Sequence, residues 1–428
     1  MERNMSGHFR SAFFYDSGAA GKPWSLDLGR YPMSGTDGMI LKVFSAAAEC
    51  GVDAILLSTT PSETPADHLV TIRDLADAYR YCNENKIDFL ICVFTNDPVQ
   101  PALLKQPPSF TRLIVWAQNT PGFDYLNIAS ASANFHQLVT VSNIQRDLLA
   151  HHPIFRKTTA ILNFLTDDFI ARQCTADAVP LSVAYIGALR ASKGFQHLAN
   201  VWPAIRNAVP GATLHVYGSP GLYSSFLQVG PEGVAETEFE KQILAPLGGT
   251  RSSASGLGVI FHGSVAAGTL HTAICQSQLV VVNPNMRSTG SLETFCVSAL
   301  EASVVGKPVV GGKAGGLIEV VGHNKGGLLA STSTELESSI IRLLKDPELA
   351  TRLGSQGKIR ARRLFDSRIA IARWTSLLNN RPMPETGVQR DYPRDIRFYG
   401  RVLIRSIAPV PVIKFIKNLR LKLISANG

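Results

Sequence analysis

Two glutamates with seven residues between them are the side chains of this sequence best placed to bind a polar ligand. Glu293 comes just before a helix-period segment, Phe295–Val305, and Glu301 lies two turns inside it. The turn around Glu301 is apolar, so an isolated carboxylate there needs a partner such as a pair of sugar hydroxyls. The helix N-terminus would present unpaired backbone amides to an anion, namely those of Phe295, Cys296 and Val297. The alternatives are a solvent-facing residue for Glu301 and simple stabilisation of the helix dipole for Glu293.

A basic loop and a glycine pair could complete this site. Arg190 and Lys193 lie in the stretch GALRASKG, Gly187–Gly194, which follows a predicted strand. Their charges would neutralise a diphosphate leaving group, and the alternative is a solvated basic loop. Further along, Gly315 and Gly316 form a turn with no side chain to block a ligand.

Two loops of the N-terminal half also follow predicted strands. Gly35 lies in YPMSGTDG, Tyr31–Gly38, which is typical either of close backbone approach to a phosphate or sugar, or of a tight loop that caps a helix. Gln118 and Asn119 follow the run LIVWA, and they could contact a substrate or satisfy the backbone of their own loop.

The elements that position these residues alternate between strand and helix. Helical patterns such as Met39–Cys50 and His68–Asn85 lie between some of the apolar strand-like runs. The runs are Ser11–Tyr15, Ala54–Ser58, Phe89–Val93, Leu113–Trp116, Gln137–Val141 and Thr159–Leu162, then Ser182–Ile186, Thr213–Tyr217, Gly258–His262, Leu279–Asn283, Pro308–Gly311 and Gly327–Leu329. This alternation predicts an α/β protein with two doubly wound, Rossmann-like domains.

The boundary between the two series is expected at Ala171–Pro180, a polar stretch without periodicity. The segment Tyr223–Ser255 reads as an irregular insertion with a short helix at Glu236–Leu244. Ligands of open parallel sheets bind at the carboxyl ends of the strands, so the two domains should share a cleft lined by the loops described above.

Composition restricts the class of protein further. The 428 residues are 45% hydrophobic, enough for two full cores, and no apolar run approaches the roughly 20 residues that span a bilayer. The N-terminus lacks the pattern of a secretory signal, so we expect a cytoplasmic protein. The six cysteines form no CxxC pair, which is typical of free thiols in a reducing compartment, and we expect no disulfide or metal role for them. They are Cys50, Cys82, Cys92, Cys174, Cys275 and Cys296.

The basic charge is concentrated in the C-terminal tail. Seven of the nine net positive charges lie from Arg390 onward, so the rest of the chain is nearly neutral. Val412–Ile424 has the pattern of a basic amphipathic helix, which could lie on an anionic membrane surface or pack on the protein itself. Nucleic acid is not expected as a partner, because one apolar-faced helix offers no extended basic groove.

The run ETFCVSALEASVVGKPVVGGKAGGLIEVV resembles the nucleotide-sugar signature of family-4 glycosyltransferases with the GT-B fold. SVAYIGALRASKG resembles the first strand and Lys-Gly loop of that family's donor domain, and GVIFHGSV, with His262, resembles its base-binding strand. The resemblance implies an N-terminal acceptor-binding domain at 1–172 and a donor domain at 176–365. It further implies a closing helix at 366–382 that returns to the first domain, followed by the tail at 383–428.

The resemblance also implies roles for individual residues. Glu293 would contact the donor sugar, Glu301 the ribose hydroxyls and Lys193 the diphosphate. Backbone at Phe295, Cys296 and Val297 would meet the phosphates. The sequence departs from the family at Thr294 and Cys296, where glycine is common, and at Ala188, where arginine is common, so that Arg190 is a candidate substitute. Many members have a histidine in the loop where this chain has Trp116-Ala117-Gln118-Asn119, and Gln118 cannot exchange protons as histidine does.

The function implied is a retaining hexosyltransferase that uses a UDP-, GDP- or ADP-sugar and a glycan or lipid-linked acceptor. No Asp-x-Asp pair occurs, so neither a cofactor nor an obligatory metal is expected, and the departing diphosphate can itself accept the acceptor's proton. Two alternatives remain: a non-catalytic module that binds a nucleotide sugar or a partner, and a nucleotide-sugar epimerase.

Overall fold

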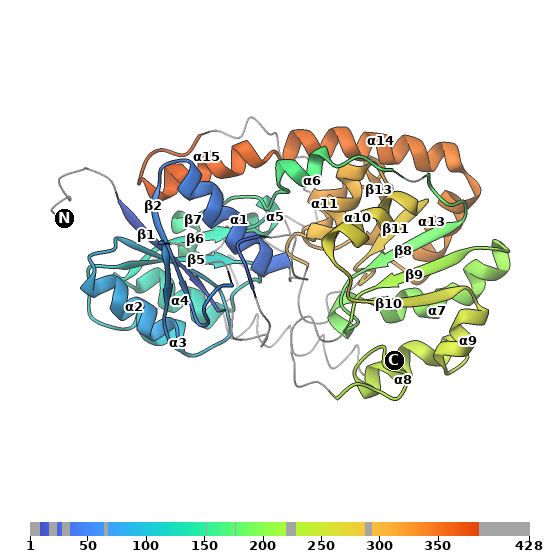
Figure 1. Ribbon diagram of the computed structural model, residues 1–428, viewed down its shortest axis with the longest axis horizontal. Coiled ribbons are helices and arrows are strands. Elements are labelled where there is room, and N and C mark those ends of the chain that lie inside the picture. Colours follow the sequence, from blue (N-terminus) through green and yellow to red (C-terminus); the bar gives the residue numbers. More distant parts are fainter. Residues whose placement is uncertain are drawn as a thin grey trace.

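The chain forms two parallel sheets, each covered by helices, which lie side by side along the long axis of the molecule (Figure 1). The structure is a computed structural model, and it describes residues 9–16, 24–27, 35–63, 67–150, 152–175, 177–219, 228–286 and 293–384. The basic tail and residues Tyr31–Ser34 of the first glycine loop lie outside the described residues. No described helix is both long enough and apolar enough to cross a membrane.

The first sheet has seven parallel strands in the order β3-β2-β1-β4-β5-β6-β7. Its strands are β1 (Arg10–Tyr15), β2 (Asp53–Ser58), β3 (Leu69–Thr71), β4 (Phe89–Val93), β5 (Arg112–Ala117), β6 (Phe135–Thr140) and β7 (Thr158–Ala160). The helices of this half are α1 (Gly35–Glu49), α2 (Leu75–Glu84), α3 (Val99–Leu104), α4 (Phe123–Ala131) and α5 (Asn143–Asp147), and α6 (Asp167–Ala171) follows on the connection to the second sheet.

The second sheet has six parallel strands in the order β10-β9-β8-β11-β12-β13. Its strands are β8 (Ser182–Ile186), β9 (Thr213–Tyr217), β10 (Val259–Gly263), β11 (Leu279–Val282), β12 (Val309–Gly312) and β13 (Gly327–Ala330). The helices are α7 (Phe195–Ala208), α8 (Thr237–Leu244), α9 (Arg251–Gly256), α10 (Ala267–Gln276), α11 (Val297–Val305), α12 (Leu317–Val321), α13 (Ser333–Lys345) and α14 (Pro347–Leu364), and α15 (Ser367–Leu378) follows.

The predicted α/β class with two Rossmann-like doubly wound sheets is confirmed. Each of the twelve apolar runs forms a strand, with ends that differ by no more than two residues. Burial on both faces explains why the runs are so apolar: in β5, Ile114 and Trp116 join one core cluster, whereas Leu113 and Val115 join the cluster on the opposite face.

Two local predictions were wrong. The pattern His68–Asn85 contains the edge strand β3 before helix α2 begins, because Asp74 accepts a hydrogen bond from the Asp77 amide and so caps the helix there. Helix α11 begins at Val297 rather than at Phe295, because Cys296 has the left-handed φ of 77°, which a helix cannot continue through. The short helix expected at Glu236–Leu244 is present as α8.

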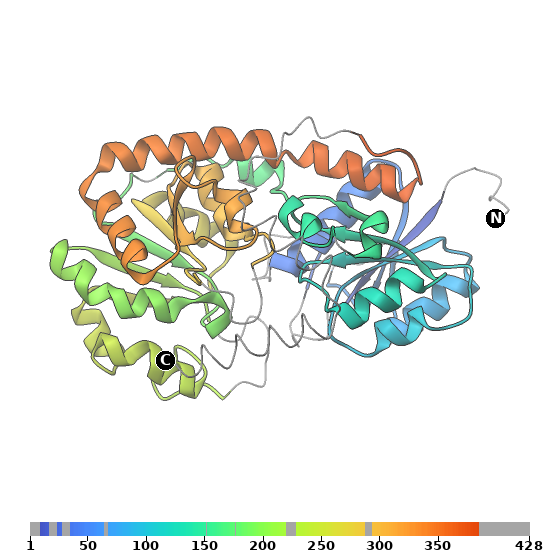
Figure 2. The same cartoon turned by 180° about the vertical axis from the view of Figure 1, so that it is seen from behind.

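The last helix crosses back to the first sheet (Figure 2). The side chain of Trp374 on α15 is fully buried and packs on Trp116 of β5, with ring centroids 4.8 Å apart, and on Phe13 of β1. Close to where α14 gives way to α15, the Ser367 hydroxyl donates to Asp167 of α6, at 2.9 Å. The two connections between the sheets therefore meet at one place.

Candidate active site

An ion pair joins the two loops predicted to hold the donor diphosphate and sugar. Lys193 Nζ lies 2.8 Å from a carboxylate oxygen of Glu293, although the residues are 100 positions apart in the sequence. The same oxygen accepts from Asn283 Nδ2 at 2.6 Å. Lys193 follows β8 and Asn283 follows β11, and these strands are neighbours, so the carboxyl ends of adjacent parallel strands bring the groups together.

Glu293 is held in its ionised form. Burial acts to raise the pKa of its carboxyl group, but the Lys193 ammonium and the amides of Asn283 and Phe295 outweigh burial and lower the pKa below its usual value. The Phe295 backbone amide donates to this carboxylate. The sequence-based expectation that this amide is unpaired was therefore wrong. The Phe295 side chain is buried against Phe365. The amides of Cys296 and Val297 remain the candidates for binding an anion at the start of α11.

The loop that carries Lys193 is fixed by its neighbours rather than by its own side chains. Ala191–Lys193 forms one turn of 3-10 helix, which follows Arg190. The Asn285 amide donates to the carbonyls of Ala191 and Ser192 at 3.1 and 2.8 Å, and the Tyr185 hydroxyl donates to that of Lys193 at 3.0 Å. Gly194 closes the turn with φ 75°, and a Cβ there would lie only 2.7 Å from the Asn285 nitrogen. Gly187 is similarly confined, since a Cβ would lie 2.9 Å from the Tyr185 hydroxyl.

Glu301, the predicted ribose ligand, interacts electrostatically with Lys42 in the other half of the molecule. Burial raises the pKa of its carboxyl group to about 7, and the positive charge of Lys42 on α1 opposes that rise. Burial also lowers the pKa of Lys42, and Glu301 opposes that change. The N-termini of the two helices approach as well, because a Cβ on Gly35 would lie 3.5 Å from a methyl carbon of Val297. A lysine inside the apolar helical pattern MILKVF is the sequence signal for this interaction.

Gln118 contacts Thr294, the residue that follows Glu293 in the sequence. The Thr294 hydroxyl donates to the Gln118 carbonyl at 2.5 Å, a contact that the family's usual glycine could not make. The Gln118 side chain is buried and exchanges hydrogen bonds with the Asn163 amide, the shorter of them 3.1 Å long. The neighbouring residue, Asn119, is exposed.

The glycine pair has a structural reason of its own. A Cβ on Gly315 would lie 2.0 Å from the Glu293 carbonyl oxygen, and one on Gly316 would lie 2.2 Å from that of Thr294. The Gly316 amide also donates to the Glu293 carbonyl at 2.6 Å. The two glycines therefore permit the close backbone approach that holds the segment before α11, and their contact with a substrate remains a prediction.

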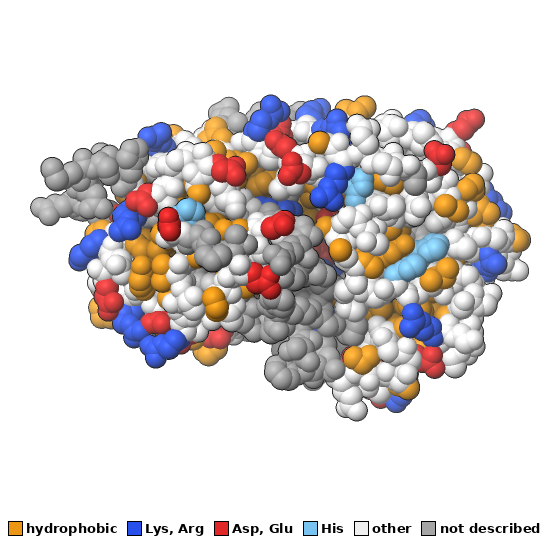
Figure 3. Space-filling model, in the orientation of Figure 1, with side chains coloured by type: hydrophobic (Ala, Val, Ile, Leu, Met, Phe, Trp, Pro, Cys, Tyr) orange, Lys and Arg blue, Asp and Glu red, His pale blue; other side chains and the backbone are white. Residues whose placement is uncertain are grey.

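His262, of the predicted base-binding strand, contacts aromatic neighbours on its own sheet, and its contact with a donor base remains a prediction. It is an exposed residue of β10, its ring is stacked on Tyr217 with centroids 4.5 Å apart, and its Nε2 lies 3.0 Å from Nδ1 of His215. Histidine side chains are visible at the surface of this half of the molecule (Figure 3). Alternation along the strand explains the placement, since Phe261 occupies the inward position.

A contact between the halves that the sequence analysis missed involves Glu319, on α12 after the glycine pair. This side chain is 5% exposed, and it accepts hydrogen bonds from Asn143 Nδ2 at 2.6 Å and from the Ile144 amide at 3.2 Å. The carboxylate thus caps α5, the helix that follows β6 of the first sheet. The carboxyl-end loops of the two sheets therefore face each other, as expected for a shared ligand site.

The expectation that all six cysteines are free was wrong. Cys174 and Cys275 form a disulfide with their Cα atoms 5.5 Å apart. They are 101 residues apart in the sequence, and only the return of the connecting segment past α10 brings them together. The other four cysteines are free.

Comparison with known proteins shows which fold this architecture has. Residues 169–360 match the model of the family described as glycosyl transferases group 1. Sucrose-phosphate synthase from Thermosynechococcus elongatus superposes with a TM-score of 0.66 over 87% of this chain and 98% of that one, at 18% identity. Anabaena HepE in complex with UDP-glucose gives 0.60 over 87% and 100%, also at 18% identity. The fold is GT-B.

The match to the glycosyl transferases group 1 model confirms the resemblance to family-4 glycosyltransferases over residues 169–360. A curated relative, the GDP-mannose-dependent alpha-(1-6)-phosphatidylinositol monomannoside mannosyltransferase of Mycobacterium tuberculosis, is 26% identical over 181 residues. Trehalose synthase of Pyrococcus horikoshii is 31% identical over 88 residues. The matches span 42% and 21% of the lengths of these relatives.

Proposed function

We propose that this protein is a retaining glycosyltransferase that moves a hexosyl group from a nucleotide-diphosphate sugar to a hydroxyl acceptor. The observation that carries the proposal is the Lys193–Glu293 ion pair, 2.8 Å long, at the carboxyl ends of adjacent strands and directly before α11. A lysine can neutralise a departing diphosphate, whereas an ionised carboxylate can orient sugar hydroxyls. The family model that residues 169–360 match supports these roles for the lysine and the carboxylate.

In the proposed complex, the second half of the chain binds the donor. Glu301 accepts hydrogen bonds from the ribose hydroxyls, and the amides of Cys296 and Val297 meet the phosphates at the start of α11. Lys193 moves from Glu293 toward the diphosphate, and Glu293 then accepts from the donor sugar. Arg190, which precedes the same 3-10 turn, adds positive charge at this end of the sheet.

The first half binds the acceptor, with Gln118, Asn119 and the N-terminus of α1 facing the donor. The Gln118 amide is paired with Asn163, and an amide cannot take a proton from the acceptor hydroxyl. The proton therefore passes to the departing diphosphate oxygen as the glycosidic bond breaks and the new one forms on the same face. Contacts between the halves, such as Thr294 with Gln118, keep water from the sugar.

We expect nucleotide release from one member of a panel of UDP-, GDP- and ADP-sugars when a membrane extract supplies acceptors. Reactions without extract measure hydrolysis, and NMR of the product reports the anomeric configuration. Release above the hydrolysis control with retention supports the proposal. Binding of a donor without release, for every donor, would instead favour a non-catalytic nucleotide-sugar module.

We further propose a glycan or lipid-linked saccharide as acceptor, with the protein acting at the cytoplasmic face of a membrane. The basic amphipathic pattern Val412–Ile424 supports this, and the mycobacterial relative is named for a phosphatidylinositol-based acceptor. Co-sedimentation with anionic phospholipid vesicles should weaken as salt rises from about 0.05 to 0.5 M, since screening reduces the attraction of each basic residue. A form truncated after residue 384 should stay in the supernatant, and equal sedimentation of that form would contradict the role of the tail.

A further inference from the structure

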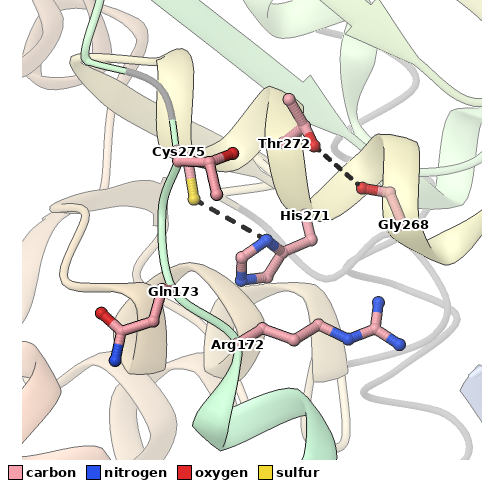
Figure 4. Close-up of a pocket in the computed structure, with 7 residues that line it drawn as sticks. Arg172, Gln173, Gly268, His271, Thr272 and Cys275 are labelled. Carbon is pink, nitrogen blue, oxygen red and sulfur yellow. Dashed lines mark hydrogen bonds between the residues drawn. The ribbon is translucent and has the colours of Figure 1, made fainter.

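The disulfide lies where the first connection between the two sheets passes α10. Cys174 belongs to the segment between α6 and β8 and is exposed, whereas Cys275 on α10 is only 2% exposed. The imidazole of His271, one helical turn before Cys275, lies between Cys275 and Arg172 (Figure 4). Its Nδ1 is 3.7 Å from the sulfur of Cys275. One cysteine of the pair is therefore exposed, and the other is buried and adjacent to a base.

The oxidised state leaves His271 incompletely satisfied. The ring is 6% exposed, and Nε2 has no hydrogen-bond partner among the residues that the structure describes. A disulfide sulfur carries no proton, so Nδ1 must be the protonated nitrogen if it is to bond to Cys275, and Nε2 is then a buried acceptor without a donor. In the dithiol state Cys275 can donate to Nδ1. His271 can thus donate to the disulfide sulfur or accept from the thiol at the same place, and its Nε2 has no partner among the described residues in either redox state.

The disulfide lies beside contacts that join the two halves. Phe169 on α6 packs edge-on against His271, with centroids 5.3 Å apart, and Asp167 of that helix accepts from Ser367 on the second connection. A pocket of about 290 Å³ separates the connecting segment from the start of α10, and Arg172, Thr175 and Gly268 are among its lining residues. With the disulfide open, this pocket gives the segment room to move relative to α10.

We propose that Cys174 and Cys275 form a reversible thiol–disulfide switch, in which His271 is the base for the buried thiol. The disulfide ties the first connection between the two sheets to α10, and the dithiol releases it. The reaction partner is a low-molecular-weight disulfide of the glutathione class. The exposed Cys174 thiolate attacks one sulfur of that disulfide, its S–S bond breaks, and one external thiol leaves.

His271 then takes the proton of the Cys275 thiol, and the resulting thiolate attacks the sulfur of Cys174. The second external thiol leaves with that proton. Two cysteine thiols are oxidised by two electrons, and one external disulfide is reduced to two thiols. Burial and the charge of Arg172 lower the pKa of His271, so the ring is neutral near pH 7 and free to accept the proton.

The test uses the full chain in buffers of reduced and oxidised glutathione, with rapid alkylation and mass spectrometry of each cysteine peptide. We expect wild type to interconvert between dithiol and disulfide. C275S should stop at a mixed disulfide on Cys174, whereas C174S should leave the buried Cys275 unmodified. H271Q should slow the second step by about 10²-fold, so that the mixed disulfide on Cys174 accumulates. C50S, which removes another exposed thiol, is the matched control and should behave as wild type.

Hydrogen exchange supplies the conformational readout. Backbone amides of residues 167–182 should exchange more slowly in the oxidised wild type than in the reduced one, and C174S should match the reduced form under both conditions. The proposal is overturned by a disulfide that excess reduced glutathione does not open, by equal rates for H271Q and wild type, or by exchange that is the same in both redox states.

Discussion

Replacement of Lys193 by alanine is expected to lower the rate of sugar transfer by about 10²- to 10³-fold, the cost typical of removing one charged or hydrogen-bonding group that stabilises a developing negative charge. Lys193 is the cation that lies 2.8 Å from the Glu293 carboxylate at the predicted diphosphate site. Its loss removes the charge that balances the departing diphosphate, and it also leaves Glu293 with only amide donors. The effect should appear mainly in kcat, because the leaving group becomes more negative in the transition state.

Three controls separate chemistry from folding. Lys193→Arg keeps the charge and should recover part of the rate, whereas Lys241→Ala, at an exposed pair on α8, should leave the rate unchanged. The double variant Lys193→Ala/Glu293→Gln also lacks the unpaired carboxylate. It should regain any thermal stability that the unpaired carboxylate cost, but it should not regain sugar transfer. A Lys193→Ala enzyme that transfers sugar at the rate of wild type would refute the assignment.

Glu301→Ala is expected to weaken binding of the nucleotide diphosphate by roughly 10- to 100-fold, because hydrogen bonds to a charged group contribute about 1.5–3 kcal/mol. Glu293→Ala should affect the free nucleotide much less, because Glu293 is assigned to the sugar. Isothermal titration with the nucleotide diphosphate and with the corresponding nucleotide sugar distinguishes the two glutamates. Unchanged affinity of Glu301→Ala for the free nucleotide would contradict this division of roles.

The affinity should also depend on pH in a defined direction. The pKa of Glu301 is about 7, so the carboxyl group is protonated below that pH and loses acceptor capacity for the ribose hydroxyls. Binding should therefore weaken as pH falls from 8 to 6, by at most about tenfold per pH unit below the pKa. Glu301→Gln should bind weakly at every pH, and its residual dependence measures the titration of the ligand itself.

The same raised pKa affects stability with a defined sign. An unfolded glutamate titrates near pH 4.5, so the folded state holds the Glu301 proton more tightly. This contribution to the free energy of unfolding is complete below pH 4.5 and is lost as pH rises through about 7. Deletion of the carboxyl group in Glu301→Gln should flatten that part of the pH profile.

The positions of twelve of the thirteen described strands could be predicted from the sequence, because parallel strands buried on both faces must be continuous apolar runs. β11, for example, is Leu-Val-Val-Val and fully buried. The positions of Lys193 and Glu293 also followed, since residues after neighbouring parallel strands must meet at one edge of the sheet. The start of α11 did not follow, because Cys296 has a left-handed conformation that its residue type does not predict. The two residues before Phe295 pack closely on Gly315 and Gly316, a long-range contact without a local signal.

The sequence by itself thus determined the fold class, the two series of strands and the placing of the Lys193 loop and Glu293 at one cleft, all of which depend on local periodicity and on the geometry of parallel sheets. Only the tertiary structure decided that Lys42 interacts electrostatically with Glu301, that Glu319 caps α5 and that Cys174 bonds to Cys275. Each of these contacts joins elements whose separation in the chain carries no periodic signal. They depend on how the packed halves and the connecting segment lie relative to each other. Burial and hydrogen bonding across the whole molecule determine that arrangement.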